Sequence, residues 1–250
     1  DATDRNRTSP FAFTGNKFEF RMVGSRDSIA GPNVVLNTIV ADAFSQACDV
    51  LEKADDFELA VHDLIKEYAT DHQRIVFNGN GYSASWVKEA ERRGLPNITC
   101  MVEAIPALTT EKAVKLFETF HVFTRAELES RAEVEYDSYS KVINIEGMAM
   151  VNIAGKQIIP AVIRYATNLA DSIGKIASVC PEADISVQKE LLLETSDLLS
   201  EMKVALAELS DACEQCRNIK DCKERANAFR KQVVPTMEKL RIPADTLEKI

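Results

Sequence analysis

Charged side chains alternate with apolar ones in a short segment near the start of the chain. Within the run from Asn16 to Val23, Lys17, Glu19 and Arg21 occupy every second position, between phenylalanine and methionine side chains. Because successive residues of a β-strand point to opposite faces, this period predicts a strand with one apolar face and one face that carries plus, minus and plus charges. Upstream, the tripeptide Asn-Arg-Thr adds the guanidinium of Arg7.

The charged face of this strand has two interpretations. One is a site for a divalent metal and phosphate groups. The Glu19 carboxylate is a hard oxygen ligand suited to Mg²⁺ or Mn²⁺, and Arg7, Lys17 and Arg21 are cations that hold phosphate oxygens during phosphoryl transfer. The other is a solvated sheet face on which these side chains form cross-strand ion pairs. Spacing alone leaves both interpretations open.

After this strand, apolar residues recur mostly at helical spacing. Capping and stop signals help to place the helix ends: Ser83 before one helix, Gly94 after it, and a capping box from Thr124 to Glu127 before the longest one. Pro160 should kink that helix. A short strand is possible at 74–77. Helices are expected at about 33–51, 56–70, 83–93, from 110, and at 124–177, 186–213 and 221–239.

These elements predict a mainly α fold, in which a short β segment is followed by a long-helix bundle or hairpin. A helix from 124 to 177 is too long to stand alone, and the helices expected at 186–213 and 221–239 supply packing partners. A coarse domain boundary is expected between about residues 55 and 105.

Composition excludes several classes of protein. The net charge of −9 and the absence of a basic stripe argue against nucleic acid as a partner. No uninterrupted apolar run approaches the roughly 20 residues of a membrane span, so no membrane partner is expected. Six cysteines in 250 residues fit a reducing cytoplasm rather than a disulfide scaffold.

Other motifs carry weaker signals. Cys213, Cys216 and Cys222 lie close in sequence, but no histidine is near to complete a zinc site, and we interpret them as reduced thiols. The segment 78–83 resembles a phosphate loop superficially, lacks the Lys-Ser/Thr ending, and is interpreted as a structural turn. The single tryptophan, Trp86, is expected to anchor its helix to the core.

The segment DRNRTSPFAFTGNKFEFRMVGS, with the following SIAGPNVVLNTIVADA, resembles the end of the catalytic domain of type III glutamine synthetases. That family pattern is an Asn-Arg-Ser/Thr, a strand with Glu-x-Arg, and a loop with Pro and Asn that leads into a helix. The resemblance continues through FNGNGYSASWVKEAERRGLPN, residues 110–131 and INIEGMAMVNIAGKQIIPAVIRY, and so covers about residues 3–165.

The resemblance implies roles for four residues. Glu19 would be a ligand of the metal near the nucleotide phosphates. Arg21 would contact the γ-phosphoryl group or the side-chain carboxylate of the substrate glutamate. Arg7 would hold nucleotide phosphate or stabilise the transferring phosphoryl group, and Lys17 would contact the nucleotide. An arginine that commoner glutamine synthetases carry in the intervening loop has no counterpart, since residues 8–15 include no basic side chain.

The resemblance also implies a two-step ligase reaction. ATP phosphorylates the γ-carboxylate of glutamate, and ammonia then attacks the acyl phosphate to give glutamine. The implied cofactors are ATP and Mg²⁺ or Mn²⁺, and the implied assembly is a homo-oligomeric ring, a dodecamer, in the cytoplasm. Residues 1–75 would end the catalytic domain, and residues 76–250 would form the helical C-terminal domain.

The family's other metal ligands lie upstream of the segment that this chain resembles. We therefore expect the 250-residue chain to be inactive alone and, since it begins at Asp1 without a methionine, to belong to a longer protein. The alternative, from a different class, is a non-catalytic helical module for oligomerisation or protein interaction. In that case Glu19 and its neighbours would have no chemical role.

Overall fold

The fold of this chain is mainly helical in a computed structural model that describes residues 11–13, 18–20, 28–77 and 80–250. It divides into two compact units. The first comprises residues 1–100 and 110–125, and the second comprises residues 101–109 and 126–250. The division expected from the resemblance, 1–75 and 76–250, concerns the domains of a longer protein and stays a prediction.

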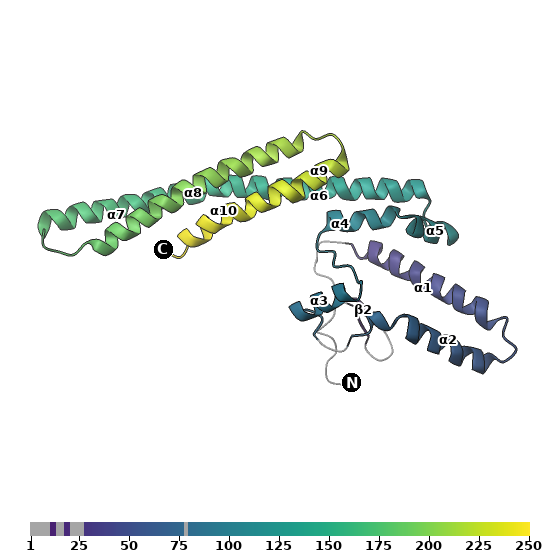
Figure 1. Ribbon diagram of the computed structural model, residues 1–250. Helices are drawn as coiled ribbons and strands as arrows, with labels where there is room; N and C mark the ends of the chain where they lie inside the picture. Colours follow the sequence, from purple (N-terminus) through teal and green to yellow (C-terminus); the bar gives the residue numbers. More distant parts are fainter. Residues whose placement is uncertain (1–10, 14–17, 21–27, 78–79) are drawn as a thin grey trace. The chain divides into compact units, whose positions relative to one another are not determined.

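Among its described residues, the first unit contains four helices of six or more residues and a short 3₁₀ turn. Helix α1 packs against α2 and α5. The segment interpreted as a possible strand at 74–77 is not one, because Gln73–Ile75 forms the 3₁₀ turn. The helices are α1 (Ala30–Leu51), α2 (Phe57–Asp71), α3 (Ala84–Arg92) and α5 (Glu111–Thr119) (Figure 1).

Two three-residue strands precede these helices. β1 (Phe11–Phe13) and β2 (Phe18–Phe20) pair antiparallel, with Ala12 opposite Glu19. The longer strand expected over 16–23 falls mostly outside the described residues. Its place at the edge of a larger catalytic sheet therefore stays a prediction.

Helix α1 is the one helix in the described part of the chain whose length and composition would suit a membrane span. An 18-residue window of this helix has a mean hydropathy of 1.3, and only 6% of that window is buried. Ile39, Val40 and Phe44 are exposed on it, while Asp42 and Asp49 interrupt its apolar surface. Because core helices pass the same test, this observation alone assigns no membrane role to α1.

Helices α3 and α5 end in the same backbone motif. After α3, the N–H groups of Gly94 and Leu95 donate to the carbonyls of Glu91 and Ala90, both at 2.9 Å. After α5, those of His121 and Val122 donate to the carbonyls of Glu118 and Phe117 at 3.1 and 2.9 Å. This is the Schellman arrangement, which requires a left-handed residue after the helix. Gly94 has φ 68° and His121 has φ 53°.

Glycine should be more stable than histidine in the left-handed conformation after α5. His121→Gly is expected to raise the free energy of unfolding by up to about 1 kcal/mol, because a side chain with Cβ is strained at positive φ and the His121 side chain is exposed. Gly94→Ala, at the equivalent position after α3, is expected to lower it by about 1 kcal/mol. Denaturant unfolding of both variants measures these changes, and two changes of the same sign would contradict the account.

The second unit consists of long antiparallel helices. Helix α8 lies beside α7 and α10 (Figure 1) and packs against each of them. Its elements are α4 (Met101–Ala104), a 3₁₀ turn (Ile105–Thr109), α6 (Arg125–Ile153), α7 (Ile159–Val179), α8 (Ser186–Arg217), α9 (Cys222–Ala228) and α10 (Val234–Leu247).

Along the central helix α8, a set of fully buried side chains recurs at intervals of seven residues. Thr195, Met202, Leu209 and Cys216 are all fully buried. A seven-residue repeat of buried side chains is typical of helices that pack side by side like strands of a coiled coil. The expected bundle of long helices is therefore present in this unit.

A π-helical turn precedes two of the helices. Ala154–Ile158 lies between α6 and α7, and Phe229–Val233 lies between α9 and α10. In each case a proline, Pro160 or Pro235, occupies the second residue of the helix that follows. A proline cannot donate the backbone hydrogen bond to the preceding turn, and a π turn is one way in which a helix accommodates the change in pairing. The π turn thus lies one turn before Pro160, and the kink expected at Pro160 stays a prediction.

Gly147 on helix α6 packs closely against the side chain of Cys213 on α8. A Cβ atom placed on Gly147 would lie 2.8 Å from the Sγ of Cys213 and 3.4 Å from a methyl carbon of Val233. Real Cβ atoms do not approach sulfur so closely. Cys213 and Val233 are fully buried members of the main hydrophobic core. Gly147 is thus fixed by packing rather than by backbone conformation.

Candidate functional site

The residues predicted to carry chemistry lie mostly outside the described part of the chain. Arg7, Lys17 and Arg21 are outside it. For Glu19 the structure describes the backbone, which pairs with Ala12 in the β1–β2 hairpin, and the side chain is outside. Whether these four side chains meet in one site stays a prediction.

Within the described residues, one cluster of three charged side chains lies on helix α3. Both carboxylate oxygens of Glu89 accept hydrogen bonds from Arg92, from Nε and Nη2, each at 2.7 Å. The Nε of Arg93 donates to the same carboxylate at 2.6 Å. Sequence reasoning missed this cluster. The signal that would have found it is the tandem Arg-Arg three and four residues after a glutamate, the spacing at which helical side chains meet.

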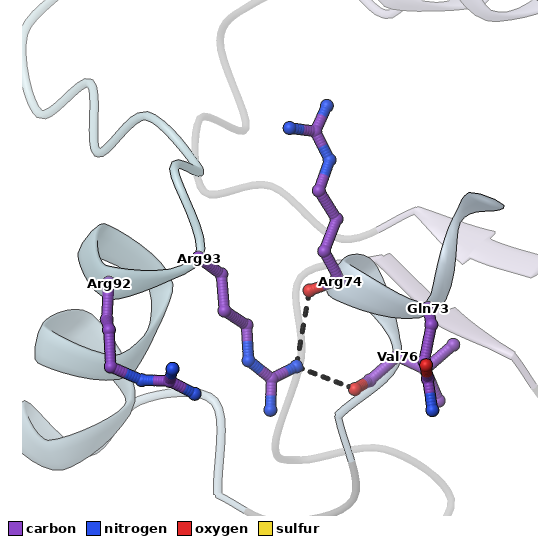
Figure 2. A pocket seen from close by; sticks show the side chains of 5 residues that line it. All are labelled: Gln73, Arg74, Val76, Arg92 and Arg93. Carbon is purple, nitrogen blue, oxygen red and sulfur yellow. Dashed lines mark hydrogen bonds between the residues drawn. The ribbon is translucent and has the colours of Figure 1, made fainter. Parts of the chain in front are cut away.

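Arg93 joins helix α3 to the 3₁₀ turn that precedes it in the chain. Its Nη1 donates to the backbone carbonyls of Val76 and Arg74 at 2.9 and 3.2 Å, as the dashed lines in Figure 2 show. The guanidinium lies 5.4 Å from the centre of the Trp86 ring, a cation–π distance. With these contacts and Glu89, Arg93 holds one fixed orientation.

The Trp86 ring packs against the Arg93 guanidinium. The same ring stacks on Phe77, with 3.9 Å between ring centres. The helix that carries Trp86 begins where the sequence predicts: the side chain of Ser83 accepts a hydrogen bond from the Trp86 backbone N–H. Trp86 thus ties the helix to Phe77, which is 36% exposed, so the expected anchoring to a buried core is not shown.

A pocket of about 440 Å³ opens between these two segments. Gln73, Arg74, Val76, Arg92 and Arg93 line it (Figure 2). Figure 2 shows Arg92 and Arg93 reaching from α3 toward the 73–76 segment, while the Arg74 side chain extends away from Arg93. Three guanidinium groups around one pocket can hold an oxyanion, and the sequence alone does not bring Arg74 and Arg93 together.

The two arginines hold the pKa of Glu89 at about 2, well below its ordinary value of 4.5, chiefly through the hydrogen bonds from Arg92 and Arg93. A lowered carboxyl pKa stabilises the folded state at pH values above 4.5, and this contribution is lost as the pH falls toward 2. Glu89→Gln is therefore expected to lower the unfolding midpoint at pH 6 more than at pH 3. Thermal unfolding followed by Trp86 fluorescence measures the difference.

The control for this prediction is Glu91→Gln, on the same helix, because the Glu91 side chain is exposed and forms no ion pair among the described residues. A gap between wild type and Glu89→Gln that stays constant from pH 6 to pH 3 would show that charge on Glu89 does not stabilise the fold.

The cysteines show no arrangement suited to metal. Cys213 and Cys216 are buried, and burial raises the pKa of both thiols. The Sγ of Cys216 contacts the side-chain oxygen of Gln232 at 3.8 Å. Among the described residues, no group of three or more His, Cys, Asp or Glu side chains is placed to hold a metal ion. Raised pKa values disfavour the thiolate, so these are poor nucleophiles and ligands.

Comparison with known proteins identifies a family. Residues 60–177 match the family described as the glutamine synthetase C-terminal domain. The whole chain is 36% identical to the type-3 glutamine synthetase of Dictyostelium discoideum and covers 35% of it. The glutamine synthetase of Bacteroides fragilis (strain YCH46) is 33% identical over 99% of the chain, with 35% of that protein covered. The glutamine synthetase of Butyrivibrio fibrisolvens is 32% identical over the whole chain, with 36% of that protein covered.

The chain is mainly helical, and residues 60–177 match a glutamine synthetase C-terminal domain, which indicates a protein of the glutamine synthetase class. The similarity to the Dictyostelium type-3 protein extends over the full chain, so the chain is similar along its whole length to a type III glutamine synthetase. It spans about 35% of the length of that relative.

Proposed function

We propose that this chain is part of an ATP-dependent glutamate–ammonia ligase that makes glutamine through γ-glutamyl phosphate. The observation that carries the proposal is the 36% identity, over the entire chain, to a protein named type-3 glutamine synthetase. In this proposal residues 1–75 complete the catalytic domain and residues 76–250 form its helical C-terminal domain. The intact protein acts as a cytoplasmic homo-oligomeric ring, a dodecamer.

The proposed roles follow the charges of the N-terminal segment. Arg7 and Lys17 hold the phosphates of ATP, and Arg21 neutralises either the transferred phosphoryl group or the glutamate carboxylate that receives it. Glu19 is the one metal ligand that we assign to this chain, and its oxygen donors fit Mg²⁺ or Mn²⁺. A bound divalent ion would neutralise charge on the phosphates. Its other ligands come from elsewhere in the protein, so the 250-residue chain alone is inactive.

The proposal is tested by the release of ADP from ATP in the longest native polypeptide that contains this chain. The expected result is ADP release that requires Mg²⁺, glutamate and ammonia together, with glutamine formed in equal amount. ATP hydrolysis that is indifferent to glutamate and ammonia, or no reaction at all, would overturn it.

The second candidate is a helical module for assembly without catalysis, which the exposed apolar side chains on α1 and α2 favour. Ile39, Phe44, Phe57 and Ile65 are each about half exposed or more, and apolar surface of this kind is typical of interfaces. Sedimentation of the 250-residue chain tests part of this alternative. A stable oligomer would show that this region carries assembly contacts. Ligase activity in the native polypeptide would then decide whether assembly is its only role.

A further inference from the structure

The pocket between helix α3 and the 73–76 segment has donors that are not used within the fold. The Nε and Nη2 of Arg92 are paired with Glu89, and the Nε and Nη1 of Arg93 are paired with Glu89 and two carbonyls. This leaves Nη1 of Arg92 and Nη2 of Arg93 without a partner among the described residues, and the Arg74 guanidinium forms no hydrogen bond or ion pair there.

We propose that this pocket, lined by Gln73, Arg74, Arg92 and Arg93, binds a phosphate-type oxyanion. Guanidinium groups present paired N–H donors in a plane, which suits the oxygens of phosphate. Two of the three, on Arg92 and Arg93, are held in place by Glu89, and Arg93 also by two backbone carbonyls. The third, on Arg74, extends away from Arg93 in this structure and would have to turn toward a bound oxyanion to contact it, and the Gln73 amide supplies a further donor.

The charge of the pocket matches a phosphate dianion. Arg74, Arg92 and Arg93 contribute three positive charges, and the Glu89 carboxylate that pairs with two of them removes one, so two positive charges remain. This concentration of positive charge occurs in a chain whose net charge is −9. A monocarboxylate would leave one of these charges unbalanced, which favours phosphate over a carboxylate side chain.

The immobilised Arg93 distinguishes the pocket from a chance group of surface arginines. Its side chain is only 23% exposed, whereas that of Arg92 is 74% exposed. An oriented guanidinium loses less conformational entropy when a ligand binds than a mobile one does.

The inference is independent of the ligase proposal, because it rests on residues 73–93 alone and holds whichever reaction the intact protein performs.

The single tryptophan of the chain makes the test direct, because Trp86 lies under Arg93. Inorganic phosphate and pyrophosphate are titrated into the 250-residue chain at constant ionic strength, with chloride as the replaced anion and glutarate as a dicarboxylate comparison. Trp86 fluorescence and the ³¹P line width are recorded in parallel, so that a site that does not change the fluorescence is still detected. The expected result is saturable phosphate binding in the wild type.

Two variants test whether the arginines form the site. Arg74→Gln is expected to raise the dissociation constant for phosphate about tenfold or more, which is the usual effect of removing one charged hydrogen bond. Arg164→Gln, an exposed arginine on α7 in the other unit, is expected to leave it unchanged. Thermal unfolding of Arg74→Gln should match the wild type, which separates loss of binding from loss of fold.

Several results would overturn the inference. These are a phosphate titration that cannot be told from the chloride control, equal phosphate affinity in Arg74→Gln and wild type, and saturation by glutarate without saturation by phosphate. Because ligase activity is not a readout here, failure of this inference leaves the proposed function untouched, and the reverse also holds.

Discussion

Replacement of Glu19 by Gln is expected to reduce ammonia-dependent ADP release by the longest native polypeptide at least about 100-fold. Glutamine has nearly the same shape but no negative charge, so it is a much weaker ligand for a hard divalent cation. If Glu19 helps to hold the ion at the nucleotide phosphates, its loss should weaken the interactions that offset charge on the transferred phosphoryl group. The measurement is steady-state ADP release over a range of Mg²⁺ concentrations.

The control for this variant is Glu214→Gln, an exposed glutamate on α8 for which the same change of charge should leave activity near wild type. The oligomeric state of both variants is checked by sedimentation, since activity lost together with assembly says nothing about the metal. An intact assembly with Glu19→Gln activity within a few-fold of wild type would remove Glu19 from the site.

The largest effect on stability is expected from Gly147→Ala. The added methyl group would lie 2.8 Å from the Cys213 Sγ. Cys213 is fully buried, so its sulfur has no free space into which to move. Overpacking of this kind costs about 1–3 kcal/mol, which exceeds the gain of up to about 1 kcal/mol that alanine brings over glycine in a helix. We therefore expect a net loss of up to about 2 kcal/mol in the free energy of unfolding.

Two further variants separate packing from helix propensity. At Gly174, on α7, a Cβ atom would meet nothing within 4 Å, so Gly174→Ala should be neutral or stabilising by about 0.5–1 kcal/mol. Cys213→Ala removes the atom in conflict, and the double variant with Gly147→Ala should be more stable than the sum of the single changes predicts. Denaturant unfolding measures these free energies. Additive effects would show that the contact between Gly147 and Cys213 does not cause the loss of stability in Gly147→Ala.

Local signals predict much of the helical architecture. The cap at Ser83 and the left-handed Gly94 are determined by neighbouring residues, and the structure shows both. The helix start expected near residues 109 and 110 is also present, with Thr110 as its cap. The left-handed His121 was not predicted, because histidine is an uncommon residue at that position and only the hydrogen bonds after α5 reveal it.

Features that depend on distant residues were not predicted. The run Arg74–Phe77 is rich in β-formers, yet the carbonyls of Arg74 and Val76 bind the Arg93 side chain in place of a neighbouring strand. The oxyanion pocket requires residues about 20 positions apart to meet, which no local pattern encodes. The predicted site at Arg7, Lys17, Glu19 and Arg21 rests on the family resemblance, since the same alternation of charges would also suit a solvated sheet face.

The π turn before α7 determines where deletions can be tolerated. Buried and half-buried residues follow one another at intervals of four through this turn, at Ala154, Ile158, Val162 and Ala166. A regular α-helix has 3.6 residues per turn, so successive steps of four would drift around its axis, and the wider π turn offsets part of that drift. Loss of one residue between 154 and 158 would rotate all of α7 by about 100° against α8. Proteins of this family should therefore rarely differ in length between these positions.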